Sequence, residues 1–308
     1  MATEISIVTP IYNRSEIFER TLKSIEKSNS QIFQYIVVSD GCDDFSNLKA
    51  LIESYSTRLN VFLCRLNRNQ GTCEAINFGV KHVSSEWVMF LGSDDEIDNQ
   101  GLQLINTYLK NISDDVDFIY YSMYDSNMNV RPYKKPNNTL NLVNYLIHMN
   151  LVLGKDQELG VLIRRRVIVI SPMPSNHAYE DRFHLDLVNK FNGIFLDIPL
   201  KKINKDAKVR ASTPQMKIRN QTEYIKILGQ TSGFLETFNL YKKVMFLHAP
   251  NYLKSIILKY FRRRVLLFRN YKKGTKVGNV MFKYSVDLEM LSYLARIYLI
   301  RIFPNWNR

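Results

Sequence analysis

Cysteine is scarce in this sequence of 308 residues. It occurs three times, at Cys42, Cys64 and Cys73, and no two of these form a CxxC pair. An odd number of cysteines without that spacing argues against a disulfide framework and a structural zinc site, and it fits a reducing cytosol. No stretch reaches about 18 uncharged apolar residues, and the first residues lack the pattern of a secretory signal. We therefore expect a cytoplasmic protein without a spanning helix.

Acidic residues are scarce near the C-terminal end. Residues 251–308 contain thirteen Lys and Arg residues but only two acids, so they carry most of the formal net charge of +13. A basic segment of this kind indicates an anionic partner, which could be a membrane surface, nucleic acid or a phosphorylated substrate. The alternative is a basic surface that only confers solubility. The whole chain is 45% hydrophobic and 23% charged, which argues against wholesale disorder.

The first hundred residues alternate between short apolar runs and amphipathic stretches. The apolar runs predict strands at 5–9, 35–38, 61–65 and 87–91. The amphipathic stretches predict helices at 15–25, 47–55 and 72–82. This order predicts an α/β fold with a mostly parallel sheet, in which ligands bind at the carboxyl ends of the strands. Further strands are expected at 118–123 and 194–198, and further helices at 140–149 and 179–190.

Glycine and proline thin out beyond about residue 206, where long helical patterns take over. We therefore expect two regions, an α/β domain at 1–205 and a basic, mainly helical region at 206–308. Within the second region, apolar residues recur at helical spacing among Lys and Arg residues. Such a helix can lie in the interface of an anionic membrane. The alternative is a helical subdomain with a basic exposed face.

Acidic residues stand where two of the predicted strands end. Asp40 precedes Gly41 and could accept hydrogen bonds from a nucleotide, although Asp-Gly is also a common turn. Asp94 and Asp95 could offer oxygen ligands to Mg²⁺ or Mn²⁺, or could cap the turn that follows. A third acidic site, the pair at 180–181, opens a predicted helix. It could supply a general base, or it could be a first-turn acid that the helix dipole stabilises.

These positions fall within five segments whose order and spacing resemble family 2 glycosyltransferases, over about residues 4–200. The segments read ISIVTPIYNR, VVSDGCDD, NQGTCEAINFGV, WVMFLGSDDEID and YEDRFHLDL. The resemblance implies the GT-A fold, a Rossmann-like nucleotide-binding domain. It also implies transfer of a sugar from a nucleotide-diphosphate donor, commonly a UDP-sugar, with inversion at the anomeric carbon. GDP and dTDP are the alternative nucleotides.

The resemblance assigns most of the acidic and loop positions to the donor site. The donor-binding positions are Pro10, Tyr12, Asn13, Arg14, Asp40, Asn69, Gly71, Asn77, Ser93 and Asp94. Among them Pro10 and Tyr12 shape the base pocket and Asp40 contacts the nucleoside. Asp94 resembles the metal-binding aspartate, with Asp95 beside it, and the metal would be Mn²⁺ or Mg²⁺.

Two further roles concern the reaction itself. Asp181, next to Glu180, resembles the catalytic base that deprotonates an acceptor hydroxyl. Lys208 or Arg210, after the last predicted strand, is the candidate to cover the pyrophosphate. One departure concerns the metal site, because many members of the family have an acid where this chain has Gly92. The missing carboxylate puts tight metal binding in question.

The sequence thus favours an inverting transferase that acts on a saccharide or lipid-linked saccharide in surface polysaccharide or glycolipid assembly. We expect it to bind peripherally to the inner face of the cytoplasmic membrane. Two other hypotheses remain. A catalytically inactive scaffold with the same fold would bind without turnover. A nucleic-acid-binding protein would use the basic segment, but it would leave the acids at the strand ends unexplained, and no nucleic-acid motif is present.

Overall fold

A computed structural model describes residues 5–125, 130–131, 139–152, 159–174, 180–204, 221–269 and 284–302. Contacts between residues divide the chain into two compact units. The first comprises Met1–Asn144 and Asp156–Thr213, and the second comprises Tyr145–Lys155 and Pro214–Arg308. A short stretch from the middle of the sequence therefore belongs with the C-terminal helices. The three cysteines are free thiols and are buried.

The first unit is built on one ten-stranded sheet with the order β3-β2-β1-β4-β9-β6-β10-β5, beside which β7 pairs with β6 and β8 with β10. The strands are β1 (Ile5–Ile11), β2 (Gln34–Asp40), β3 (Val61–Leu66), β4 (Trp87–Phe90), β5 (Glu96–Ile97), β6 (Phe118–Asp125), β7 (Val130–Arg131), β8 (Thr139–Leu140), β9 (Gly160–Arg164) and β10 (Gly193–Ile203). Strands β3, β2, β1 and β4 are parallel, whereas β9 runs antiparallel between β4 and β6. The predicted α/β class is confirmed.

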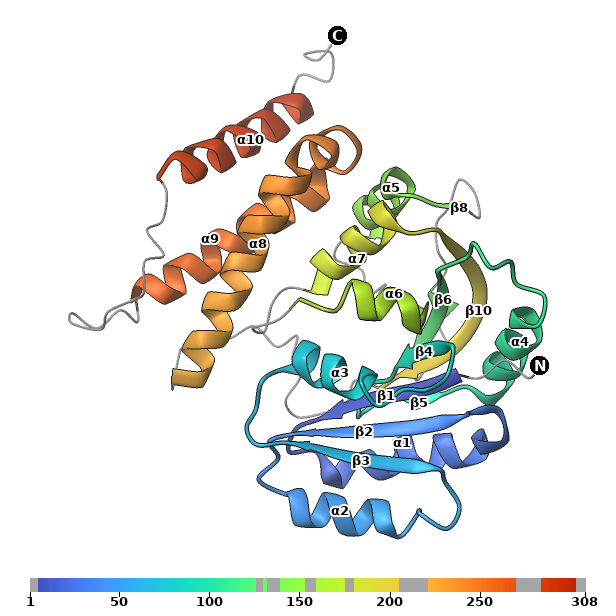
Figure 1. Ribbon diagram of the computed structural model, residues 1–308. Helices are drawn as coiled ribbons and strands as arrows, with labels where there is room; N and C mark the ends of the chain where they lie inside the picture. Colours follow the sequence, from blue (N-terminus) through green and yellow to red (C-terminus); the bar gives the residue numbers. More distant parts are fainter. Residues whose placement is uncertain are drawn as a thin grey trace. The chain divides into compact units, whose positions relative to one another are not determined.

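Helices cover both faces of the sheet (Figure 1). Those of the first unit are α1 (Ser15–Lys27), α2 (Phe45–Glu53), α3 (Thr72–Val80), α4 (Asn99–Leu109), α6 (Arg165–Ile170) and α7 (Glu180–Lys190). Ile7 and Val37 share one buried cluster with Phe18 of α1. On the other face α3 lies so close to the sheet that a Cβ on Gly79 would come within 2.6 Å of Val8 Cγ1. The alternating apolar residues of the strands thus fill two core layers.

The second unit consists of helices. It contains most of α5 (Leu142–Val152), together with α8 (Gln221–His248), α9 (Pro250–Arg269) and α10 (Tyr284–Ile302). Helices α8 and α9 pack along each other, and the Arg263 guanidinium lies 5.0 Å from the centre of the Phe234 ring. Lys242 of α8 forms an ion pair with Glu289 of α10 at 2.7 Å. The helical C-terminal region is therefore confirmed, and none of the described helices is long and apolar enough to cross a membrane.

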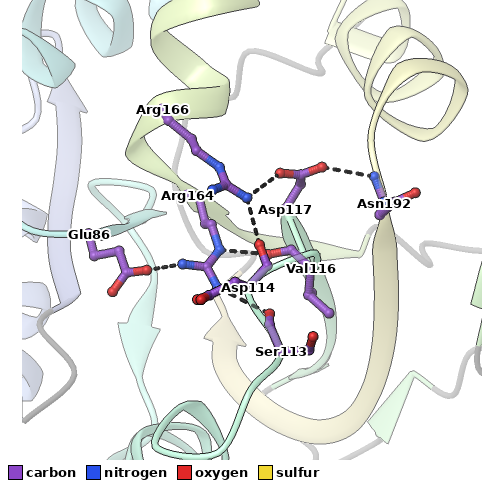
Figure 2. Close-up of polar contacts among 8 residues, drawn as sticks. All are labelled: Glu86, Ser113, Asp114, Val116, Asp117, Arg164, Arg166 and Asn192. Atoms are coloured by element: carbon purple, nitrogen blue, oxygen red, sulfur yellow. Dashed lines mark hydrogen bonds and ion pairs between the residues drawn. The ribbon is translucent and has the colours of Figure 1, made fainter. Parts of the chain in front are cut away.

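Arg164, at the end of β9, braces the edge of the sheet at which β4 and β6 begin (Figure 2). Its guanidinium donates to the carbonyl oxygens of Val116 (2.6 Å) and Ser113 (3.2 Å). It also pairs with Glu86 and lies 4.7 Å from the centre of the Trp87 ring. These contacts give a buried cation several hydrogen-bond acceptors, as burial of a charge requires. Arg164 therefore stabilises the edge opposite to the predicted donor site.

Candidate active site

The predicted donor residues gather at one edge of the sheet, where β1, β2 and β4 end. Pairing of Ile11 with Ser39 and of Val8 with Phe90 keeps these three strands in parallel register. The chain therefore leaves β1 into Tyr12, leaves β2 at Asp40, and turns after β4 through residues 91–95. This edge is where ligands bind in open parallel sheets.

Asp40 anchors the loop between β3 and α3. Its side chain is 3% exposed, and its two carboxylate oxygens accept hydrogen bonds from the backbone amides of Gln70 (2.7 Å) and Gly71 (2.8 Å). Burial raises the pKa of Asp40, although the two amide hydrogen bonds lower it in part. Asp40 therefore fixes the loop that carries Asn69, another predicted donor residue. The sequence predicts a turn or a nucleotide contact for Asp40, and its bonds to the two amides add a third role.

Glycine is required where this loop crosses the end of β2. Gly41 has a φ of 68°, a value that L side chains rarely adopt. A Cβ at this position would lie 2.3 Å from the carbonyl carbon of Arg68. Gly71, which precedes α3, also has a positive φ, of 93°. The two glycines thus let the loop approach the strand closely enough for its amides to reach the Asp40 carboxylate.

Asn13 joins the loops that follow β1 and β2. Its side-chain amide donates to Asp43 at 2.8 Å and accepts from the Asp43 backbone amide at 2.8 Å. Asn13 also has a φ of 49°, which Asn tolerates better than most residues. Next to it, Tyr12 is exposed, and partial burial and the charge of Asp43 raise the pKa of its hydroxyl. Pro10 lies within β1 and is half-buried.

Arg14 and Asp94 form an ion pair that links the end of β1 to the turn after β4. The Arg14 Nη1 and Asp94 Oδ2 atoms are 3.1 Å apart, and the two side chains are 23% and 14% exposed. An arginine and a carboxylate thus stand together at the ligand edge. An anionic ligand can pair with the guanidinium and a divalent cation can bind the carboxylate, since these are the groups that each prefers.

Asp95 lies in a different environment from its neighbour Asp94. It is buried, and its carboxylate pairs with Lys201 Nζ at 3.2 Å and accepts from the Asn204 backbone amide at 3.3 Å. Thr21 of α1 donates to the Asp95 carbonyl oxygen at 2.7 Å. Asp95 therefore holds the turn against the end of β10. Neither Lys201 nor Asn204 was predicted as a site residue. The one feature of the sequence that points to them is the pair of lysines near the end of β10.

Gly92 lies close to the side chains of both acids in this turn. A Cβ at this position would lie 2.6 Å from Asp95 Oδ2 and 3.2 Å from Asp94 Oδ1. An acidic side chain at 92 would therefore collide with Asp95. The preceding strand is continued by Leu91, whose amide donates to the Val8 carbonyl at 3.1 Å. A carboxylate at 92 thus requires the side chains of Asp94 and Asp95 to shift from the positions described above.

Asn77 binds the backbone of another segment. Its side chain donates to the Met173 carbonyl (2.8 Å) and accepts from the Met173 amide (2.9 Å). It thereby fastens the chain that follows α6. Both amide atoms of this predicted donor residue are engaged in that contact.

Of the remaining predicted residues, the structure describes the surroundings of Ser93 but not those of the others. Ser93 is buried, and its carbonyl accepts from Thr21 at 3.1 Å. Glu180 and Asp181 form the first turn of α7, but their side chains are outside the described residues, as are Lys208 and Arg210. Further along α7, His184 Nδ1 bonds to the Tyr120 hydroxyl at 2.7 Å, and burial lowers the His184 pKa to about 4. His184 is therefore a packing residue.

Metal ligands are sparse at this edge. Among the residues that the structure describes, no three His, Cys, Asp or Glu side chains gather as they would in a protein-only metal site. In the turn after β4, Asp94 is partly exposed, whereas Asp95 is buried and paired with Lys201. This donor set fits a divalent cation that takes most of its ligands from a bound diphosphate and water, as Mg²⁺ commonly does.

The fold and this edge define the GT-A-like class of nucleotide-sugar transferases. The sequence model of the family described as "Glycosyl transferase family 2" matches residues 6–164. The chain therefore belongs to glycosyl transferase family 2. One curated relative is the GalNAc(5)-diNAcBac-PP-undecaprenol beta-1,3-glucosyltransferase of Campylobacter jejuni, which is 30% identical over 95 residues, or 30% of each chain. The matched stretches span only 13–29% of the length of three other curated relatives.

Solved structures share the fold at lower identity. Residues 1–349 of S. aureus TarS in complex with UDP-GlcNAc align with a TM-score of 0.58 and 18% identity, covering 86% of this chain and 84% of that one. The mannosyltransferase PcManGT from Pyrobaculum calidifontis, in complex with GDP-Man and Mn²⁺, aligns with a TM-score of 0.52 and 11% identity, covering 99% and 88%. At these low identities, both alignments show that the fold is shared.

Proposed function

We propose that this protein transfers a sugar from a UDP-sugar to a hydroxyl group of a saccharide or lipid-linked saccharide, with inversion at the anomeric carbon. The observation that carries the proposal is the edge formed by Asp40, Arg14 and Asp94, in a chain that belongs to glycosyl transferase family 2. The complex of TarS with UDP-GlcNAc supports UDP as the nucleotide. Surface polysaccharide or glycolipid assembly is the process to which such a transfer would belong.

The donor diphosphate would bind at the ion pair. Arg14 would turn from Asp94 to the phosphates, since both groups are partly exposed and one guanidinium can form two parallel hydrogen bonds with a phosphate. Asp94 would then hold a divalent cation, for which the Mn²⁺ complex of PcManGT offers a precedent. When bound, the cation would neutralise the negative charge that grows on the leaving diphosphate.

The nucleoside would lie beside the loop that Asp40 anchors. This loop carries Asn69 and Gly71, and Tyr12 is exposed at the end of β1. A rigid loop lowers the entropic cost of binding, because its backbone is already ordered before the donor binds. Asp40 would therefore contribute to donor binding through the loop, in addition to any direct contact with the nucleoside.

The catalytic base would be Asp181, in the first turn of α7, with Glu180 beside it. Its carboxylate would take the proton of the acceptor hydroxyl as that oxygen attacks the anomeric carbon. The bond from this carbon to the diphosphate oxygen would break on the opposite face, with its electron pair leaving on the diphosphate. Asn77 would position the segment that leads to α7, through its two hydrogen bonds to Met173.

A membrane-bound acceptor would suit the basic C-terminal region. The C. jejuni relative is named for an undecaprenol-linked acceptor. The basic helices of the second unit would bind peripherally to an anionic membrane. Flotation with phosphatidylglycerol vesicles tests this part of the proposal, and failure of the protein to float with them would refute it.

Turnover in a matched pair of variants tests the transfer reaction. UDP release would be measured from UDP-sugars with a lipid-linked saccharide extract as acceptor. We expect Asp181→Asn to lower turnover by about 10²–10⁴-fold, which is the usual contribution of a general base. Asp114→Asn removes the same charge from a fully exposed site at the opposite edge of the sheet, and should turn over normally. Undiminished turnover in Asp181→Asn would refute the assignment of the base.

A further inference from the structure

A pocket of about 610 Å³ lies in the second unit, between α5 and α9. Its described lining residues are Asn150, Asn251, Lys254, Ser255, Leu258, Lys259 and Arg262. The six that come from α9 are spaced by three or four residues along one face of that helix. Asn150 is fixed against the start of α9, because its side-chain oxygen accepts from the Asn251 amide at 2.9 Å.

The charge in this pocket is of one sign. Three of the described lining residues are cations and none is acidic. Lys254 and Arg262 have no carboxylate partner among the residues that the structure describes, although the Lys254 ammonium lies 4.2 Å from the centre of the Tyr298 ring. Burial, and secondly the charge of Arg262, lower the pKa of the neighbouring Arg263. Lys254 and Arg262 therefore bring to the pocket positive charge that no described carboxylate pairs with.

The donor groups match an oxyanion. Lysine and arginine are the side chains that bind phosphate, and the amides of Asn150 and Asn251 and the hydroxyl of Ser255 add neutral donors. The volume is in the range of small-molecule sites and admits a phosphate together with the group that it esterifies. None of the described lining residues is aromatic, so the pocket offers no surface on which nucleic-acid bases would stack.

We propose that this pocket binds a phosphate ester, and that the ligand is the phosphate of the acceptor that the transferase uses. The second half of the statement rests on the proposed function, whereas the first does not. The phosphate could be carried by a soluble acceptor or by the headgroup of a lipid. The chemistry of recognition is the same in both cases, and the experiment distinguishes the two sources.

The test compares two variants with the same change of charge. Arg262→Glu reverses a charge in the pocket, and Lys243→Glu reverses an exposed charge on α8 that does not line it. Binding of glycerol 3-phosphate is followed by broadening of its ³¹P resonance in the presence of saturating UDP and diamagnetic Mg²⁺, which together occupy the proposed donor site. Binding to phosphatidylglycerol vesicles is followed by flotation.

We expect Arg262→Glu to weaken binding by about tenfold or more, because it removes charge-assisted hydrogen bonds. Lys243→Glu should change it by less than about twofold. Loss with glycerol 3-phosphate identifies a soluble phosphate as ligand, and loss with vesicles alone identifies a lipid headgroup. Absence of binding to both probes, or equal losses in both variants, would overturn the proposal. UDP binding in the same preparations reports separately on the proposed donor site, and UDP release from a UDP-sugar reports on the proposed transfer.

Discussion

The buried carboxylate of Asp40 allows a sharp test of how the donor loop is held. Asp40→Asn keeps the size of the side chain but replaces one acceptor oxygen by an amide nitrogen. One of the Gln70 and Gly71 amides, now at 2.7 and 2.8 Å from oxygen, would then face a second donor. A hydrogen bond to a charged group is worth about 1.5–3 kcal/mol. Burial of the Asp40 charge is unfavourable, as its raised pKa shows, and a neutral Asn avoids that cost. This offsets part of the loss, so we expect a net destabilisation of about 2 kcal/mol.

The assay combines chemical denaturation with titration of UDP. Asp43→Asn is the matched control for charge, because Asp43 is exposed in the loop that follows β2, makes no contact with the Gln70 or Gly71 amides, and should cost less than about 0.5 kcal/mol. If Asp40 anchors the loop, Asp40→Asn lowers both the free energy of unfolding and the affinity for UDP. A loss of UDP affinity with unchanged stability would refute the anchoring role and assign Asp40 to direct contact with the nucleoside.

Three further predictions concern other parts of the first unit. Arg164→Ala should destabilise the protein by about 2–3 kcal/mol in denaturant melts, because it removes buried hydrogen bonds. The control Arg166→Ala changes an exposed side chain and should cost less than about 1 kcal/mol. Gly92→Asp should weaken Mn²⁺-dependent UDP binding in calorimetry, because its Cβ would displace Asp95; tighter binding would contradict this. The His184 pKa of about 4 lies below its ordinary 6.5, so stability should fall by up to about 3 kcal/mol as pH drops from 6.5 to 4. His184→Gln should flatten that dependence in melts across this range.

The strands and the edge at which they end could be predicted from the sequence, because both depend on local patterns. Apolar runs closed by Asp40 and Gly41, or by Asp94, indicate where a parallel strand stops and which edge of the sheet its polar residues reach. The predicted strand at 194–198 was too short, because β10 continues to Ile203 beyond a proline and two lysines. The short strands β5, β7 and β8 were not predicted, since two residues give no periodic signal.

What each polar group contacts could not be predicted, because the partners are distant in sequence. Asp94 and Asp95 are neighbours, yet one is paired with Arg14 and the other with Lys201. The sequence pattern alone does not show that the two acids have different partners. The difference follows from how the turn packs against Arg14 on one side and Lys201 on the other. The assignment of Asn77 to the donor site likewise came from the family resemblance, whereas its side chain is bound to a backbone 96 residues away.

Calorimetric titration of the purified protein with UDP, GDP and dTDP, each with and without Mn²⁺, tests the proposed donor site most directly. We expect that UDP binds, that Mn²⁺ strengthens its binding, and that Asp94→Ala abolishes the effect of Mn²⁺, because Asp94 is the proposed metal ligand in the turn after β4. Lack of binding to all three nucleotides, with and without the metal, would contradict the account.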